Sequence, residues 1–282
     1  MIKKIIFFSS ISLLISCSNN STDQDKVADN LVDTTKKGTA AQPQNELADF
    51  KFHALVINIP SPFEIITLLP ESGVPFKQEL VNSTNNSTKY NTTTQKGLNY
   101  GAYIVDLIYL SSNEHFSEVK NYFVTSRGLA QNLGFVETFD HIIGPRMEKN
   151  IDKKDTIIKI IDQIYVEMDS YLRSNDRLLA ATQILVGSWI ESQYITANVI
   201  KDQTKNKKNE ILFQKILKQN FASQKLVELL KEYEKEKDFK PIIDGVTELN
   251  KLYSDLHGDD IDAATLQKLC SKLNEVRGKF VN

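Results

Sequence analysis

The chain has 282 residues, of which 34 are lysine or arginine and 36 are aspartate or glutamate, so its formal net charge at neutral pH is −2. With this balance, and without a basic stripe carrying interleaved aromatic residues, nucleic acid is not an expected partner. Residues 47–282 are long enough for one large domain or two small ones.

The first sixteen residues have the layout of a secretory signal peptide. Two lysines precede an apolar stretch at residues 5–15, which is shorter than the roughly 20 residues needed to span a bilayer. The stretch ends in Leu14-Ile15-Ser16-Cys17, which resembles the bacterial lipobox. The resemblance implies that residues 1–16 are cleaved off and that Cys17 carries acyl chains, which would hold the protein on a membrane. The alternative is an ordinary signal peptide with a chance cysteine.

Residues 17–46 are predicted to be a flexible tether behind the acylated cysteine. They are rich in Ser, Asn, Thr, Asp, Gln and Lys, with no apolar period. A tether of this length reaches on the order of 30 Å. The only other cysteine, Cys270, lies in a helical pattern and is interpreted as a small buried apolar residue.

The body begins with short elements. Ser61-Pro62-Phe63-Glu64 forms a capping box, which predicts a short helix that ends near Pro70. Residues 52–59 are the one strand-like run, because they are β-branched at their end and stop at Pro60. Residues 82–94 are a polar loop.

Helices are expected almost throughout the rest of the chain. The first four should cover residues 97–110, 112–133, 137–150 and 155–173, the third bent at Gly144-Pro145. Gly134-Phe135 has the pattern of a Schellman stop. Aspartates recur every seven residues on the fourth helix, and we interpret them as a solvated face, with a cation site as the alternative. Residues 177–200 are apolar on all sides, which is typical of a helix in the middle of a bundle.

The C-terminal part predicts further helices after a polar loop at residues 201–210. One long helix should run over residues 211–233, another from Pro241 to Gly258, and the last should be capped by Asp260. The near-heptad apolar spacing favours an antiparallel hairpin. The predicted fold is therefore all-α, a multi-helix antiparallel bundle in which residues 47–200 form a helical domain and residues 211–282 pack on it or extend it.

Readily recognised catalytic motifs are absent from the sequence. It contains no GxxxxGK[ST], HExxH or GxSxG motif and no EF-hand loop. Four histidines, at positions 53, 115, 141 and 257, lie far apart without metal-ligand spacing. No cofactor or metal is predicted, and an enzyme is not the favoured class.

Two lone acids are the candidate site. Asp106 and Glu191 are each the only charged residue inside a long, mostly apolar stretch. Tyr103 and Tyr109 lie three positions before and after Asp106, and Tyr194 lies three after Glu191, so phenols share the helical faces of the acids.

Two interpretations of these acids stay open. Buried carboxylates need partners, so each acid can be bound to a Tyr, a Ser or an arginine such as Arg127, Arg146 or Arg173. Alternatively the five residues line a polar pocket for a small ligand, or the two acids act as a general acid and base.

Four stretches of the body together resemble a group of predicted Bacteroidota lipoproteins of uncharacterised function. They are IPSPFEIITLL, KYNTTTQKGLNYGAYIVDLIYL, FVTSRGLAQNLGF and KKDTIIKIIDQIYVEMDSYLRSNDRLLAATQILVGSWIESQYI. The resemblance covers about residues 55–200 well and the C-terminal helices loosely. It implies a helical lipoprotein exported to the cell envelope, and it brings no activity.

Three functions therefore remain compatible with the sequence. The favoured one is a lipid-anchored binding or scaffold module of the bacterial cell envelope. The outer membrane is its expected location, the periplasmic or surface face is left open, and an envelope protein is a possible partner. The alternatives are a small-ligand-binding protein with a pocket near Asp106 and Glu191, and an acid/base hydrolase that uses the same carboxylates.

Overall fold

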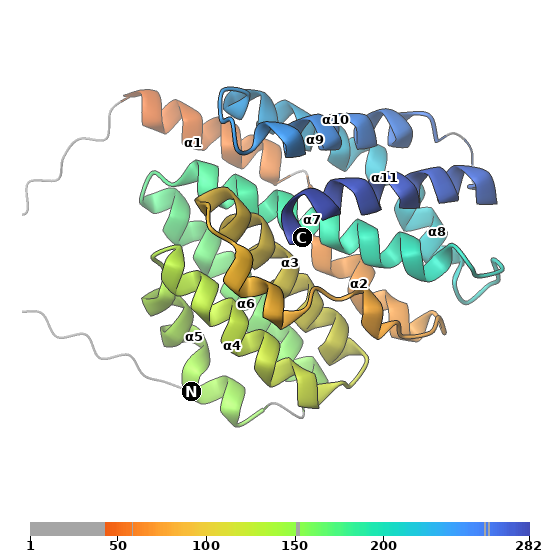
Figure 1. Cartoon of the computed structure of the whole chain (residues 1–282), viewed down its shortest axis with the longest axis horizontal. Coiled ribbons are helices and arrows are strands. Elements are labelled where there is room, and N and C mark those ends of the chain that lie inside the picture. The colour runs from red at the N-terminus through yellow and green to blue at the C-terminus, as the bar shows by residue number, and fades with distance from the viewer. Residues whose placement is uncertain (1–42, 58, 151–152, 257, 259) are drawn as a thin grey trace, which may run out of the picture. The chain divides into compact units, whose positions relative to one another are not determined.

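The structure, a computed structural model, describes residues 43–57, 59–150, 153–256, 258 and 260–282. The predicted signal peptide, Cys17 and most of the predicted tether lie outside these residues, as does His257. Within the described residues the chain forms α-helices and short 3-10 helices and no strand, which confirms the predicted all-α bundle (Figure 1). The helices are α1(Pro43–Val56), α2(Pro62–Glu71), η1(Gln78–Leu80), η2(Thr84–Lys89), α3(Thr93–Ser112), α4(Phe116–Asn132), α5(Val136–Glu148), α6(Lys154–Ser174), α7(Leu178–Ile200), α8(Glu210–Leu217), α9(Gln219–Leu230), η3(Lys231–Tyr233), α10(Lys240–Ser254) and α11(Ala263–Val281).

The core is built around α3 and α7, which pack directly on each other. Nearly every residue of both helices is buried, as predicted for residues 177–200. Two glycines let the backbones touch. A Cβ at Gly187 would lie 2.0 Å from the carbonyl oxygen of Leu98, and one at Gly101 would lie 2.2 Å from that of Ile184. No side chain fits between the helices at these points.

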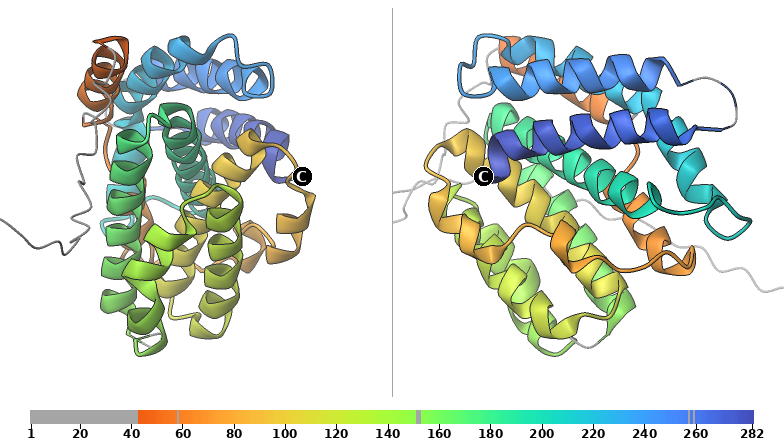
Figure 2. Two further views of the ribbon diagram at one scale, coloured as in Figure 1. Left: turned by 90° about the vertical axis from the view of Figure 1, so that its left-hand side faces the viewer. Right: turned by 45° about the vertical axis from the view of Figure 1, so that its right-hand side comes forward.

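The other helices cover this central pair. α2, α6 and α11 each contact both α3 and α7, whereas α4 packs on α3 and α5 lies against α4 and α6. Figures 1 and 2 show α10 and α11 running side by side in opposite directions with a turn between them. This is the predicted C-terminal antiparallel hairpin.

The N-terminal end of the body differs from the prediction. Most of the strand-like run at residues 52–59 is helical, because α1 extends to Val56. The same helix also includes residues 43–46, which were predicted to belong to the tether. Phe52 is buried and Leu55 and Val56 pack against the core at helical spacing, so burial of one helix face outweighs the β preference of the run.

The C-terminal helices also differ in two details. The predicted long helix at residues 211–233 is divided at Lys218 into α8 and α9. The two parts bury their apolar faces against different neighbours, α2 and α7 for α8 and mainly α1 and α10 for α9. The cap of α11 is Asp262, which accepts a hydrogen bond from the Thr265 backbone at 2.8 Å, and not Asp260.

Local signals elsewhere are confirmed. Ser61 caps α2 through the backbone N–H of Phe63, although the reciprocal bond of the predicted capping box is not formed and the Glu64 carboxylate pairs with Lys215 instead. Gly134 ends α4 with a φ of 75°, and the N–H of Phe135 returns to the carbonyl of Ala130 at 3.0 Å. The third predicted helix, α5, continues through Gly144-Pro145 as far as Glu148.

Candidate functional site

Glu191 of α7 forms a two-pronged ion pair with Arg277 of α11. The Nε of Arg277 donates to Oε2 of Glu191 at 2.6 Å, and its Nη2 donates to Oε1 at 2.7 Å. The Glu191 side chain is fully buried, and the ring of Tyr194 lies 4.1 Å from the guanidinium carbon. Burial lowers the pKa of Arg277, but the adjacent Glu191 carboxylate outweighs it and the pKa is raised. Arg277 is therefore fixed as a cation inside the protein.

The three arginines named from the sequence are the wrong partners. Arg127 pairs with Asp140, Arg146 donates to Gln163 and Arg173 pairs with Asp169. Each lies on a helix surface and is bound close by. Among the described helices, only α11, which packs along α7, brings an arginine to Glu191.

Asp106 of α3 lies beside this ion pair and is also fully buried. Its Oδ2 accepts a hydrogen bond from the backbone N–H of Asn82 at 3.0 Å, whereas its Oδ1 has no donor among the described residues. Burial, and then the neighbouring Glu191 carboxylate, raise the pKa of Asp106 well above its usual range, although Arg277 and the Asn82 N–H oppose this. The folded protein therefore favours a proton on Asp106 more than the unfolded chain does. Such a proton would supply a donor between two carboxyl groups that otherwise can only accept.

The segment 77–83, which we call the strap, lies over these acids and is bound to them and to the nearby phenols. Its backbone is hydrogen-bonded to four side chains from two helices, α3 and α11. The bonds join Lys77 N to Tyr109 Oη (2.9 Å), Leu80 O to Arg277 Nη2 (3.1 Å), Asn82 N to Asp106 Oδ2 (3.0 Å) and Ser83 O to Tyr103 Oη (2.8 Å). The five site residues predicted from the sequence are thus brought to one region, which we call the acid cluster together with Arg277. Glu191 is bound to Arg277, whereas Tyr103, Asp106 and Tyr109 are bound to the strap. The ring of Tyr194 lies over Arg277.

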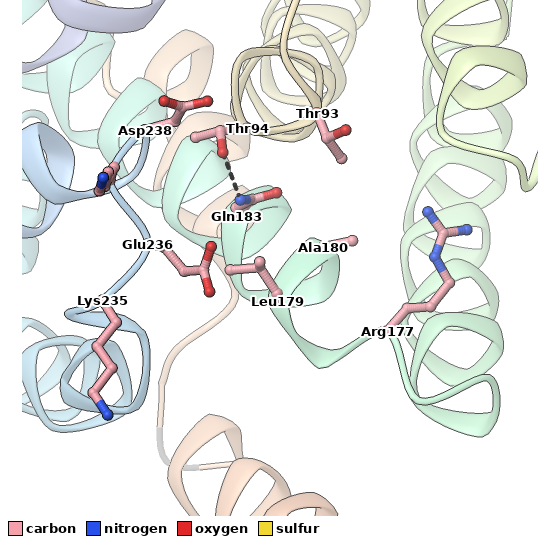
Figure 3. Close-up of a pocket in the computed structure, with 10 residues that line it drawn as sticks. Thr93, Thr94, Arg177, Leu179, Ala180, Gln183, Lys235, Glu236 and Asp238 are labelled. Carbon is pink, nitrogen blue, oxygen red and sulfur yellow. Dashed lines mark hydrogen bonds between the residues drawn. The ribbon is translucent and has the colours of Figure 1, made fainter.

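A second polar region is a surface pocket of about 600 Å³ (Figure 3). Three segments that are distant in sequence form it: the first turn of α3, the first two turns of α7, and the loop before α10. Its lining residues are Thr93, Thr94, Arg177, Leu179, Ala180, Gln183, Lys235, Glu236, Lys237 and Asp238. We call this the N-terminal pocket, because α3 and α7 both begin at it.

Gln183 is the buried polar residue of the N-terminal pocket, with 1% of its surface exposed. Its Nε2 donates to Oγ1 of Thr94 at 2.9 Å, and its Oε1 receives no hydrogen bond from any described residue. In Figure 3 this oxygen is directed to the space between Thr93 and Ala180. An unfilled acceptor at such a position is costly unless a donor reaches it.

Arg177 is the half-buried cation of the same pocket. Its backbone N–H donates to the carbonyl of Leu172 at 2.8 Å, but its guanidinium has no hydrogen bond or ion pair with a described residue. It is also the N-cap of α7, and no side chain caps that helix. Figure 3 shows Arg177 on one side of the start of α7 and Glu236 on the other.

This pocket was not predicted from the sequence. Thr92 and Gln95 form a capping box at the start of α3, a signal that is visible in the sequence. Such a box predicts where the helix begins, and nothing in it indicates that the start of α7 lies beside it.

A third depression, of about 450 Å³, lies between α6 and the α1–α2 connection. It is more apolar, and Ile57 and Val166 on its rim are 70% and 59% exposed. The carboxylate of Asp169 at this site is held by Arg173.

The described part of the chain contains neither a metal-binding cluster nor a membrane-spanning helix. No group of three or more His, Cys, Asp or Glu side chains there could hold a metal ion. His115 stacks on Phe76, with ring centres 3.8 Å apart. No helix in the same residues is long and apolar enough to cross a bilayer. Cys270 is buried and free, as predicted, and burial raises the pKa of its thiol to about 11.

Comparison with protein-family models, with curated proteins and with solved structures finds no match for this chain. The resemblance to Bacteroidota lipoproteins therefore stays a prediction from the sequence.

Proposed function

We propose that this chain is a lipid-anchored binding protein of the bacterial cell envelope. Cys17 holds it to a membrane, a tether separates the membrane from the helical body, and the N-terminal pocket binds a small ligand. The lipobox-like Leu14-Ile15-Ser16-Cys17 supports the anchor.

One observation carries the binding role, namely that the N-terminal pocket contains polar groups that the protein itself leaves unused. Gln183 has an unfilled acceptor and Arg177 has no acidic partner among the described residues. The pocket volume of about 600 Å³ falls in the usual range for small-molecule sites, roughly 300–1,000 Å³. The acid cluster is the weaker candidate for a ligand site, because its side chains are bound to each other and to the strap.

The anchor is tested by mass spectrometry of the mature N-terminus and by membrane fractionation. The expected result is an acylated Cys17 and a membrane-associated protein, and Cys17→Ser should abolish both. Cys270→Ser is the matched control and should leave them unchanged, since that thiol is buried in the body. An unmodified N-terminus that starts after Cys17 would disprove the anchor.

The binding role is tested by native mass spectrometry of the purified protein after incubation with an extract of small metabolites. Leu179→Trp should displace the bound molecule, because Leu179 lines the N-terminal pocket and the larger ring fills part of it. Val124→Trp is the control, since Val124 is an exposed valine on α4. The same molecules on all three proteins would contradict the proposed site.

A second candidate function is a scaffold that holds an envelope protein. The exposed Ile57 and Val166 beside the apolar depression favour it. Crosslinking in the native envelope should then capture one protein with the wild type and lose it with Val166→Glu. Equal capture by both would count against this function.

A further inference from the structure

The N-terminal pocket carries a positive field. α3 and α7 are 20 and 23 residues long and both begin at it, and the start of such a helix carries roughly half a positive elementary charge. Arg177 adds a full charge that no described acid neutralises. Lys235 and Lys237 on the rim are balanced by Glu236 and Asp238. The pocket therefore favours an anion beside Arg177.

Gln183 gives an independent indication of what else the ligand contains. Its buried Oε1 is an acceptor without a donor among the described residues, so a ligand that reaches this oxygen has to bring an O–H or N–H to it. Glu236 and Asp238 add acceptors on the opposite side of the pocket. Arg177 and Gln183 are six residues apart on one helix, about 9 Å along its axis. A six-carbon hydroxylated acid can span this distance.

We propose that the N-terminal pocket binds a small hydroxylated oxyanion, such as a sugar acid or a sugar phosphate. The oxyanion lies beside Arg177 and the helix starts, and a hydroxyl donates to Oε1 of Gln183. This inference rests on the proposed function, because it uses the same pocket, and it adds the ligand class.

The first test is calorimetric titration of the purified full chain with gluconate, glucose 6-phosphate and neutral glucose. At least one of the two anions should bind, with an affinity that falls as salt is added, and glucose should bind at least tenfold more weakly. Binding of glucose as tight as that of the anions, or binding of none of the three, would overturn the inference.

The second test compares two arginine variants. Arg177→Gln should weaken binding of the anion at least tenfold, whereas Arg127→Gln should leave it unchanged, because Arg127 is an exposed residue paired with Asp140 on another face. Gln183→Leu should weaken binding too. Should that variant fail to fold, Arg177→Gln decides alone, since it removes no hydrogen bond or ion pair of that side chain with a described residue. An unchanged affinity of Arg177→Gln would overturn the inference.

The two proposals can fail separately. If no probe binds but Leu179→Trp still loses a molecule that the wild type retains from an extract, the ligand class is wrong and the proposed binding role stands. If neither occurs, the pocket has no role in binding.

Discussion

Two arginines of this protein lie in polar surroundings with opposite properties. Arg277 is embedded in the acid cluster, where it is bound to both oxygens of Glu191 and to the carbonyl of Leu80. Arg177 lines the N-terminal pocket and has no polar partner for its guanidinium among the described residues. The first region binds its cation and most of its polar groups internally, with Oδ1 of Asp106 as the exception, whereas the second leaves its cation without a partner among the described residues.

This difference teaches how to separate a structural polar site from a binding site in a helical protein of this kind. Buried charges that are fully hydrogen-bonded hold elements together, here α3, α7, α11 and the strap. Unfilled polar groups next to a cavity give the protein little stability and are explained best by a ligand. Changes in the acid cluster should therefore alter stability, and changes in the N-terminal pocket should alter binding.

The largest effect is expected from Arg277→Met. It leaves a buried carboxylate at Glu191 without a cation and frees the carbonyl of Leu80. The free energy of unfolding should fall by about 3–5 kcal/mol, as measured by urea denaturation. Adding Glu191→Leu to this variant should recover part of the loss, because no uncompensated charge remains. A loss below about 1 kcal/mol for Arg277→Met would contradict the assignment of the cluster as structural.

The next effect concerns the α3–α7 contact, which supports both regions. Gly187→Ala places a Cβ against the carbonyl of Leu98. Because a backbone group cannot move aside as a side chain can, the free energy of unfolding should fall by about 3 kcal/mol, at the upper end for overpacking. Gly128→Ala on α4 is the control. No atom lies within 4 Å of its added Cβ, so it should stabilise the protein by about 0.5–1 kcal/mol. Equal melting temperatures for the two variants would show that the helices can separate without cost.

A smaller effect should appear as a pH dependence of the acid cluster. The pKa of Asp106 is raised in the folded protein, so the folded state keeps a proton that the unfolded chain releases above about pH 4. This proton stabilises the folded protein fully below about pH 4. As the pH rises above that value, the free energy of unfolding falls by up to about 1.4 kcal/mol per pH unit. Asp106→Asn has the same shape and donates to Glu191 without a titrating proton.

Denaturation of Asp106→Asn and wild type across pH 4–8 measures this contribution directly. The two proteins should be of similar stability at pH 4, and the variant should become the more stable one toward pH 8. Parallel stability curves would mean that Asp106 does not hold a proton in the folded state.

The smallest effect on stability is expected in the N-terminal pocket. Arg177→Gln should change the free energy of unfolding by no more than about 0.5 kcal/mol, because Arg177 holds no described partner. The measurement is the same urea denaturation. A loss as large as that of Arg277→Met would remove the contrast between the two arginines.

Several features were predictable from the sequence because they are local. The burial of α7 followed from its apolar composition on all sides, and the end of α4 followed from Gly134 and Phe135. The burial of Asp106 and Glu191 followed from their being lone charges in apolar helices. The fold class needed only these local patterns.

Other features depend on tertiary packing and could not be read locally. Arg277 lies on α11, where Lys272, Glu275 and Lys279 form surface ion pairs, so only the packing of α11 on α7 singles it out. The break between α8 and α9 reflects two different sets of neighbours. The N-terminal pocket joins three segments, and no spacing within one segment indicates the others.

The position of Arg277 along the chain has a consequence for biogenesis. It follows Glu191 by 86 residues, and Asp106 comes earlier still. Because a polypeptide leaves the ribosome and enters an export channel in order from its N-terminus, α3 and α7 are available before the cation that neutralises their core. Until Arg277 arrives, burying Glu191 remains unfavourable. For a chain exported as proposed, the core around Glu191 therefore lacks its neutralising partner until α11 has been delivered.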